Sequence, residues 1–438
     1  MTLATIAADV RAGRRSAVAV AREAIEALRA DPYVAVTHVL EARALAEAEA
    51  VDAIVAGGGD PGPLAGVPYG VKDLFDVAGL PTTAGARARI DAPPAATDAE
   101  AIRRLRAAGA VLVATLNMDE FAYGFATINA HFGTTRNPHD PARLAGGSSG
   151  GSAAVVAGGL LPLALGSDTN GSIRIPAALC GVYGLKPTHA ALPLDGVYPF
   201  VDSFDDIGPF AADIAGLRLA TEVLRGEAWA EEAPARIAML GGWFAENLSP
   251  DMAAARDRIA AHLGAGTVEL PSVDIARSAA FLMTAHEGGQ FHTPGLADHA
   301  LLYDPATRDR LIAGATLAPE IVERAHRFRR WFAAQADRLF SRWDVLIAPA
   351  TPCAAPPIAD PMIVLGGQRV PARAHLGIYT QPLSFIGLPS LAVPLRACGP
   401  LPLGLQLVGP PGGEARLFAL AARLEAEGFA GGWPRPGL

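Results

Sequence analysis

The chain has 438 residues, a formal net charge of -8 and a hydrophobic fraction of 51%. This apolar content excludes a disordered chain, and the length is enough for one large core or two domains. The acidic balance excludes an electrostatic basis for binding nucleic acid or an anionic membrane surface.

Three cysteines, Cys180, Cys353 and Cys398, lie far apart and form no CxxC pair, so the sequence predicts neither a disulfide framework nor a zinc ribbon. His286 and His292 are spaced too widely for the zinc-binding helix motif that pairs histidines at i and i+4. The N-terminus carries several charges and does not resemble a signal peptide, and no stretch is long and apolar enough to span a membrane. We therefore expect a cytoplasmic protein with no metal and no other cofactor.

The N-terminal part reads as helices. Ser16 can cap a helix that carries Val20, Ile25 and Leu28 on one face, and an alanine-rich helix is predicted over 39–54. The glycine- and proline-rich run 57–63 then breaks the chain. We expect an N-terminal helical arm over 1–60 and a core over 61–438, which together form one structural domain.

Lys72 lies in a short apolar segment that the valines at 67 and 71 mark as a buried strand. A lysine in such a strand normally points outward, so an ordinary exposed lysine is the alternative interpretation. The chain has very few lysines, however, and Lys72 and Lys186 both fall in glycine-rich segments, whereas arginine is used elsewhere. Lysine, unlike arginine, can lose its proton, which makes Lys72 a candidate base.

A helix–strand unit follows, which is typical of α/β folds. The run Thr97-Asp-Ala-Glu100 predicts a capping box for the helix, and the segment 110–116 is a buried strand. Asp119 and Glu120 come directly after this strand. Adjacent carboxylates seldom converge on one ion, so we expect hydrogen-bonding roles for them.

Two clusters of glycine and serine, at 146–152 and 166–172, enclose an apolar segment without charge. A flexible linker would be polar throughout, so this pattern favours two tight turns whose amides and hydroxyls face one point. Downstream, 196–209 reads as a long loop, and helices and strands then alternate to the end of the chain. The predicted strands are 237–240, 267–270, 345–349, 390–394 and 403–408, and the predicted helices are 211–224, 251–262, 319–342 and 414–427. We expect an α/β fold with a large mixed sheet and helices on both faces.

The helix predicted at 319–342 carries Phe328, Trp331, Phe332 and Phe340. Large aromatic residues at such spacing are core residues in most proteins, and the alternative is an interface, where aromatic side chains are enriched.

These turns and the lysine supply the parts of an acyl-transfer site. Serine becomes a nucleophile when a base removes its proton, and a lysine can do so if burial keeps it neutral. A second serine could relay the proton, and glycine-flanked amides could form an oxyanion hole. We assign Lys72 as base, Ser148 as relay, Ser172 as nucleophile, and the amides of Thr169, Asn170 and Gly171 as oxyanion donors. Residue chemistry alone does not choose among Ser148, Ser149, Ser152, Ser167 and Ser172.

The motifs Gly66-Val-Pro-Tyr-Gly-Val-Lys-Asp73, Gly146-Gly-Ser-Ser-Gly-Gly-Ser152 and Gly166-Ser-Asp-Thr-Asn-Gly-Ser-Ile-Arg-Ile-Pro176 resemble the amidase signature family. Further matches extend to Pro402-Leu-Gly-Leu-Gln-Leu-Val-Gly409, so the resemblance covers nearly the whole chain, with its signature region at about 64–215. It implies that Lys72, Ser148 and Ser172 form the catalytic triad, with a cis peptide bond before Ser148. It also implies that Ser149, Asp168 and Arg174 support the triad.

Two positions depart from the family pattern. Asn170 stands where most members carry glycine, so its side chain could narrow the pocket or contact substrate. The segment after Thr188 begins with His189 where many relatives have an aromatic residue, which puts roles copied to that loop in doubt. Tyr123, within the Met118–Phe125 motif, is the candidate substrate-binding residue.

Within the family, the motifs around Met118–Phe125 and Tyr198–Phe210 look most like the branch that contains 1-carboxybiuret hydrolase. The resemblance implies hydrolysis of a small carboxybiuret- or biuret-like amide. It also implies a homodimer, with room for a small subunit similar to the C subunit of tRNA-dependent amidotransferases. The alternatives are the glutaminase subunit of such an amidotransferase, a general aliphatic or aryl amidase, and a non-catalytic binding protein that kept the fold.

Overall fold

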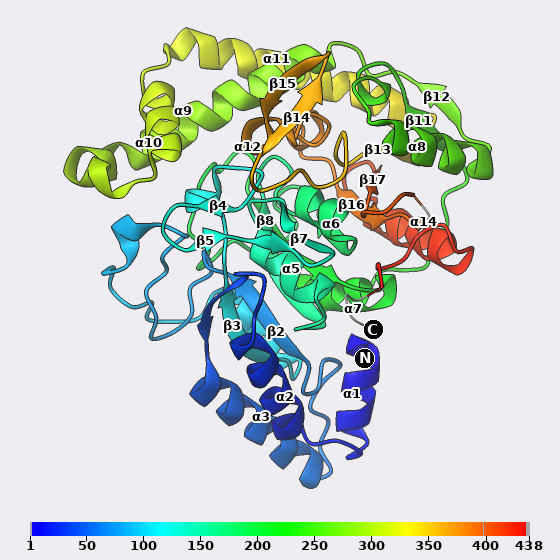
Figure 1. Ribbon diagram of the computed structural model, residues 1–438. Coiled ribbons are helices and arrows are strands. Elements are labelled where there is room, and N and C mark those ends of the chain that lie inside the picture. Colours follow the sequence, from blue (N-terminus) through cyan, green and yellow to red (C-terminus); the bar gives the residue numbers. More distant parts are fainter. Residues whose placement is uncertain (1, 397, 435–438) are drawn as a thin grey trace.

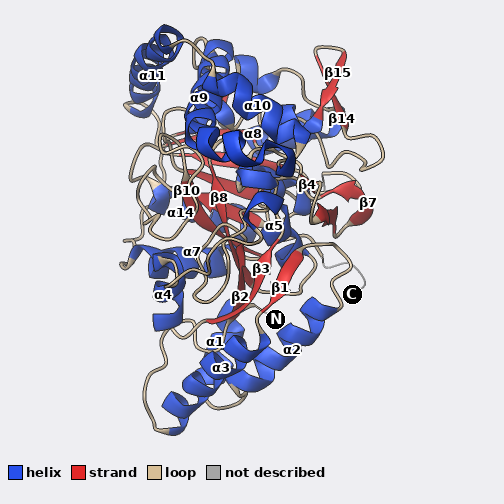
Figure 2. Ribbon diagram, turned by 90° about the vertical axis from the view of Figure 1, so that its left-hand side faces the viewer, coloured by secondary structure: helices blue, strands red, loops and turns tan. Residues whose placement is uncertain are grey.

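The structure, a computed structural model, describes residues 2–396 and 398–434. Within this part of the chain a mixed eleven-stranded sheet, in the order β1-β3-β2-β8-β10-β9-β16-β17-β13-β11-β12, runs through the centre of the molecule (Figure 2). Its strands are β1 (Val36–Val39), β2 (Pro68–Lys72), β3 (Val111–Leu116), β8 (Leu163–Asp168), β9 (Tyr183–Lys186), β10 (Asp206–Ala211), β11 (Ile237–Leu240), β12 (Gly266–Val268), β13 (Val345–Pro349), β16 (Ser390–Pro394) and β17 (Gly404–Val408).

The helices and the small sheets surround this central sheet. The two-stranded sheets pair β4 (Ile128–Asn129) with β5 (Gly133–Thr134), β6 (Arg136–Asn137) with β7 (Asp140–Leu144), and β14 (Met362–Leu365) with β15 (Gln368–Pro371). The helices are α1 (Leu3–Arg11), α2 (Ala17–Arg29), α3 (Glu41–Ala56), α4 (Glu100–Ala107), α5 (Gly150–Ala157), α6 (Arg174–Cys180), α7 (Ile214–Arg225), α8 (Pro250–Leu263), α9 (Val273–His299), α10 (Pro305–Ala315), α11 (Pro319–Phe340), α12 (Ala372–His375), α13 (Gln381–Ser384) and α14 (Glu414–Ala426).

Residues along the central strands alternate between two apolar clusters. In β13, Leu346 and Ala348 belong to the larger cluster, whereas Ile347 belongs to the smaller one. Successive side chains of a strand point to opposite faces of the sheet, so the two clusters lie on opposite faces. The smaller cluster takes its helical residues from elements that include α8 and α14, and the larger from elements that include α5, α9 and α11. The predicted α/β class, a mixed sheet with helices on both faces, is confirmed.

The N-terminal segment contributes a strand as well as helices. Helices α1, α2 and α3 gather at one end of the molecule, far from α9, α10 and α11 (Figure 1). Strand β1 pairs antiparallel with β3, and Thr37 Oγ1 lies 2.7 Å from Thr115 Oγ1. The sequence predicted only helices here, because this edge strand has four residues and is only partly buried, so it shows no clear alternation.

The segment expected to be a long loop at 196–209 instead runs into β10, which lies between β8 and β9. Gly208 and Pro209 look like turn residues in the sequence. In the structure a Cβ at Gly208 would lie 1.9 Å from Leu185 O, so glycine is needed there for close approach to β9.

The predicted capping box is also wrong. Glu100 is the first residue of α4, and its N-cap, Ala99, has no side-chain cap. The carboxylate of Asp98 instead accepts hydrogen bonds from Arg43 at 2.7 and 2.8 Å and from the Ala78 amide at 3.0 Å. No side chain caps α4, and Asp98, next to the expected cap Thr97, takes part in a long-range ion pair.

Candidate active site

Lys72 and Ser167 lie at the same end of two neighbouring strands. Strands β2 and β8 are parallel, with Val71 opposite Leu165, so their carboxyl ends meet at one edge of the sheet. Lys72 is the last residue of β2, and its Nζ donates a hydrogen bond to Ser167 Oγ at 2.8 Å. The carboxyl ends of strands are where α/β folds build ligand sites.

Ser148 reaches the same lysine from the loop before α5. The distance from Lys72 Nζ to Ser148 Oγ is 2.6 Å, and the Gly147–Ser148 peptide bond is cis, as the resemblance implied. A Cβ at Gly147 would lie 2.2 Å from Asp119 Oδ2 and 2.6 Å from the Ala126 amide nitrogen. Glycine is therefore required for the loop to pass this carboxylate.

The two lysines of the chain are both fully buried but have different partners. Lys186 Nζ lies 2.6 Å from Asp206 Oδ2, so its charge has a counter-ion. Lys72 Nζ contacts two serine hydroxyls and, among the described residues, no carboxylate within ion-pair distance. Burial lowers the pKa of Lys72 to about 7, and the more distant carboxylates, Asp119 first among them, offset this only in part. A lysine in this state exchanges its proton near neutral pH.

Ser172 lies in the turn between β8 and α6. The Ser149 amide donates to Ser172 O at 3.2 Å, which holds this turn against the paired serines. No hydrogen bond joins the Ser148 and Ser172 hydroxyls, both of which the structure describes. The structure thus brings Lys72 and Ser148 into direct contact and places Ser172 beside them through the backbone.

A fully buried ion pair shapes the Ser172 turn. Arg174 Nε and Nη2 both donate to the Asp168 carboxylate at 3.0 Å. Arg174 also donates to Gln406 Oε1 at 2.7 Å, and Asp168 accepts the Ile173 amide at 3.1 Å. Burial raises the pKa of Asp168, but the Arg174 charge and these hydrogen bonds outweigh it and hold that pKa below its usual value.

The backbone amides of the turn are not equivalent. Gly171 N donates to Asp168 Oδ1 at 2.6 Å, so this amide is already used within the protein, contrary to our expectation of an oxyanion donor. Within 2–396 and 398–434, no protein acceptor is found for the amides of Thr169, Asn170 or Ser172. Gly171 has a φ of +132°, and a Cβ there would lie 2.1 Å from Thr380 Oγ1, so only glycine fits.

A narrow cavity adjoins Ser172, with a volume of ≈ 20 Å³. This is room for about one water molecule, so a substrate needs the lining side chains to move apart. Tyr123, the candidate substrate-binding residue, lines the cavity, and its buried hydroxyl has no hydrogen-bond partner in the described structure. Asn170 lines it too and donates from Nδ2 to Thr284 Oγ1 at 2.8 Å, whereas its Oδ1 is buried without a partner among the described residues.

Two residues of the site were not assigned a role from the sequence. Ser167 was only one of five candidate serines, and Asp205 was not singled out. Asp205 accepts a hydrogen bond from Thr169 Oγ1 at 2.6 Å and from the Val201 amide at 2.8 Å. Burial raises the pKa of Asp205 to about 6. In the sequence Asp205 stands among Asp202, Ser203 and Asp206, so no local signal marks it as a buried hydrogen-bond acceptor.

Other candidate residues have structural partners. Asp119 Oδ2 accepts the amides of Ala126 at 3.1 Å and Thr127 at 2.8 Å, in agreement with the predicted hydrogen-bonding role. His189 Nδ1 lies 3.2 Å from Asp206 Oδ1. In the part of the chain that the structure describes, no group of three or more His, Cys, Asp or Glu side chains is arranged to hold a metal ion.

In this fold a buried lysine donates hydrogen bonds to two serine hydroxyls, and the backbone amides nearby have no acceptor among the described residues. This arrangement defines a hydrolase of the class that cleaves amide bonds. The chain belongs to the amidase family: the family model described as Amidase matches residues 19–418.

Relatives of known sequence and structure agree with this assignment. The chain is 44% identical to AtzE, a 1-carboxybiuret hydrolase subunit of Pseudomonas sp. (strain ADP), over 98% of this chain and 99% of that protein. It is 36% identical to the A subunit of the glutamyl-tRNA(Gln) amidotransferase of Thermus thermophilus, over 96% of each chain. A chain of a solved, inhibitor-bound structure is 44% identical to this chain, with a TM-score of 0.95, and the match covers 99% of this chain and 100% of that one. That structure is described as a vestigial protein complex that reveals the evolutionary origins of an s-triazine catabolic enzyme.

Proposed function

We propose that the chain hydrolyses a small non-peptide amide through an acyl-enzyme formed on Ser172. The observation that carries the proposal is the environment of Lys72: a buried amine with a pKa of about 7 whose hydrogen bonds within the described structure go to serine hydroxyls. Such an amine accepts a proton at neutral pH, which is what a serine nucleophile needs. Ser172 is the serine whose turn faces the cavity.

In the first half of the reaction, Ser148 passes the Ser172 hydroxyl proton to Lys72 Nζ as Ser172 Oγ bonds to the amide carbon. The relay requires the Ser172 or Ser148 hydroxyl to rotate into mutual contact. In this proposal the amides of Thr169 and Asn170, with that of Ser172 itself, stabilise the negative oxygen that forms; the support is that these amides have no acceptor among the described residues. The proton then returns to the departing nitrogen as the C–N bond breaks, which leaves the acyl group on Ser172.

In the second half, water replaces the amine. Lys72 takes a proton from water through Ser148, the water oxygen bonds to the acyl carbon, and the ester bond to Ser172 breaks. The proton returns to Ser172 Oγ, which restores the enzyme and releases a carboxylic acid. The same groups thus act as base and as acid in turn.

For the substrate we propose a carboxybiuret- or biuret-like compound. The support is the 44% identity over nearly full length to a subunit of 1-carboxybiuret hydrolase. The alternatives are the glutaminase role of an amidotransferase A subunit, to which identity is 36%, and a general aliphatic or aryl amidase.

A panel of amides tests this function. We expect the purified chain to release ammonia from biuret-type or short dicarboxylic amides, and to do so faster than from glutamine or an aryl amide. Ammonia is measured with and without a small subunit similar to the amidotransferase C subunit. Release from glutamine only, and only in the presence of a tRNA-binding partner, would instead support the amidotransferase role.

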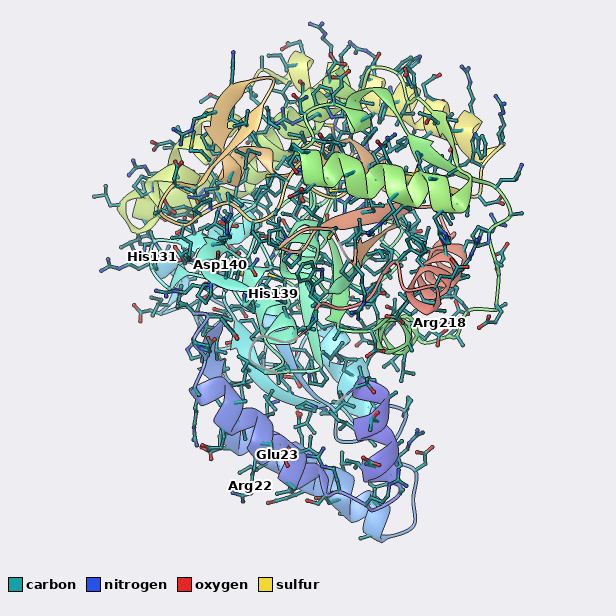
Figure 3. The ribbon with its side chains drawn as sticks, turned by 45° about the vertical axis from the view of Figure 1, so that its right-hand side comes forward. Arg22, Glu23, His131, His139, Asp140 and Arg218 are labelled. Carbon is teal, nitrogen blue, oxygen red and sulfur yellow. The ribbon has the colours of Figure 1, made fainter. Side chains whose placement is uncertain are left out.

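We also propose that the chain forms a homodimer and can bind a small amidotransferase C-like subunit. The support is the related structure described as a protein complex and exposed helical surface on the N-terminal arm, residues 1–60, outside the catalytic core, 61–438. Figure 3 shows Arg22 and Glu23 on this outer surface, at the opposite end from α9 and α11. On α11, Trp331 is 44% exposed whereas Phe332 is fully buried, and Phe328 and Phe340 are partly buried against the core.

Light scattering of the purified chain tests the assembly. We expect the mass of a dimer at micromolar concentration, and a larger mass after co-expression with a small amidotransferase C-like subunit. A monomer under both conditions would refute the dimer, and an unchanged mass and activity after co-expression would refute binding of the small partner.

We propose a cytoplasmic location. The support is that Cys180, Cys353 and Cys398 are all free, as is usual in a reducing compartment. Separately, the described residues contain no helix with the length and apolar content needed to cross a bilayer.

A further inference from the structure

Asp205 lies directly before strand β10, beside the turn that carries Ser172. Strands β10 and β8 are antiparallel, with Asp206 opposite Asp168. Because antiparallel strands run in opposite directions, the residue before β10 lies next to the residue after β8. These two residues are Asp205 and Thr169, and Thr169 opens the Ser172 turn. The register of the sheet thus places a buried carboxylate against one end of the proposed oxyanion donors.

Both oxygens of this carboxylate bind groups of the site. Oδ1 of Asp205 accepts a hydrogen bond from Thr169 Oγ1 at 2.6 Å, and Oδ2 accepts the amides of Phe200 at 2.7 Å and Val201 at 2.8 Å. Phe200 lines the narrow cavity beside the nucleophile. It also lines a second cavity, of ≈ 180 Å³, to which Thr169 and Asp205 contribute as well. Asp205 therefore ties the Ser172 turn to the loop that forms one wall of the active site.

Asp205 also carries a negative charge that no neighbouring cation cancels. Burial lowers the pKa of Lys72, and the charges of Asp119, Asp205 and Asp168 each oppose this shift. Asp119 and Asp168 each have an arginine nitrogen within ion-pair distance, at 3.9 and 3.0 Å. The partners of Asp205 in the described structure are a hydroxyl and two amides, with no cation at ion-pair distance. Its charge is therefore free to stabilise the protonated form of Lys72.

Asp205 is ionised at the pH where Lys72 exchanges its proton. Burial, and to a smaller extent the Asp206 charge, raise the pKa of Asp205 to about 6, which is below the value of about 7 for Lys72. The other charged or titratable side chains nearby are Lys186 and His189, which are the partners of Asp206, the exposed Asp202, and Arg329, which donates to the backbone of Ser203. At neutral pH Asp205 is thus a carboxylate when Lys72 accepts a proton.

We propose that Asp205 is a positioning residue of the reaction: its carboxylate fixes Thr169 at the start of the Ser172 turn, and its charge stabilises protonated Lys72. This inference rests on the proposed function and adds to it a group that acts through other residues. When the proton of Ser172 reaches Lys72 Nζ, positive charge forms on the amine while negative charge forms on the amide oxygen. Asp205 acts on the first by its charge and on the second through the position of the Thr169 amide.

Asp205→Asn tests the charge, because asparagine has the same shape. Its Oδ1 can still accept the backbone amides, and its Nδ2 can donate to the Thr169 hydroxyl. Without the negative charge protonated Lys72 is less stable, so the pKa of Lys72 falls further. The rate at which a fluorophosphonate labels Ser172, and kcat/KM for a hydrolysed amide, should both rise with pH at a midpoint roughly 0.5–1 pH unit lower than in the wild type. A purely structural role would lower these rates without moving the midpoint.

Two further variants complete the test. Asp202→Asn is the matched control, because Asp202 lines the same ≈ 180 Å³ cavity but is exposed, where solvent screens its charge. It should change neither the midpoint nor the rate at high pH. Thr169→Val keeps the Asp205 charge and removes the hydroxyl that this carboxylate binds. It should lower the rate at high pH by roughly 10-fold, the size of a hydrogen bond to a charged group.

The outcomes separate this inference from the proposed function. A midpoint for Asp205→Asn that equals the wild-type value, or lies at higher pH, would overturn the role of the charge. An unchanged rate for Thr169→Val would overturn the positioning role, and it does so even if Asp205→Asn fails to fold. In both cases wild-type labelling and amide hydrolysis that rise with pH would leave the proposed function standing. Wild-type rates that do not change with pH would instead contradict Lys72 as the base, and the inference with it.

Discussion

Lys72→Met should lower kcat by roughly 10²- to 10⁴-fold, the range for loss of a general base, and change KM little. Methionine fills nearly the same volume in the buried site but cannot take the proton from Ser148. Because proton removal occurs only on the way to the transition state, ground-state binding of the amide should survive. Steady-state kinetics on a hydrolysed amide, with binding of a competitive inhibitor as a check on the site, measure both effects.

The role of Lys72 as the base also predicts how kcat/KM depends on pH. Lys72 has a pKa lowered to about 7, so it is protonated and inactive below that pH and neutral above it. The wild-type kcat/KM should therefore rise with pH through about 7 and then level off. Lys72→Arg should not restore activity, because arginine stays protonated. Near-normal turnover by Lys72→Arg, or a flat profile between pH values of about 6 and 8, would show that another group is the base.

Arg174→Met should destabilise the fold by about 3–5 kcal/mol, because it leaves the Asp168 carboxylate buried and unpaired. Arg174 and Asp168 are both fully buried, and Arg174 also donates to Gln406. The loss should reach the active site, since Asp168 holds the Gly171 and Ile173 amides on either side of Ser172. Urea unfolding and residual amide hydrolysis report the two effects.

Two further variants make this test specific. Adding Asp168→Asn to Arg174→Met removes the stranded charge, so the double variant should recover part of the lost stability. Arg369→Met is the matched control, because Arg369 pairs with Asp360 on the surface, where both side chains are at least 60% exposed. Exposed pairs contribute about 0–1 kcal/mol. An Arg174→Met variant as stable as Arg369→Met would mean that the buried pair is not what holds the turn.

The sequence predicted the elements whose signals are local. Strands β11, β13 and β16 begin and end where their apolar runs do, and α11 and α14 end within two residues of the predicted bounds. Residue chemistry marked Lys72 and the glycine-rich turns, but the choice of Ser148 as the partner of Lys72 came from the family resemblance. Burial of Lys72 then settled the alternative of an exposed side chain.

What the sequence did not predict depends on distant partners. The sequence predicted that the Gly171 amide is an oxyanion donor. In the structure this amide donates its hydrogen bond to the Asp168 carboxylate, which is also bound by Arg174. The place of Arg310 beside Ser172 in the cavity was not predicted, because the two residues are far apart in the chain and nothing local to Arg310 marks it. Strand β10 was obscured by Gly208 and Pro209, whose place in the sheet is set by β9.

The most direct test of the account is the mass of the protein during turnover. After reaction with a slowly hydrolysed amide, or with a fluorophosphonate, intact mass spectrometry and peptide mapping should find one modification per chain, on Ser172. Ser172→Ala should abolish it, while Ser149→Ala and Ser167→Ala should still be modified at Ser172. Modification that persists unchanged in Ser172→Ala, or that maps to Ser148, would contradict the assignment of Ser172 as the nucleophile.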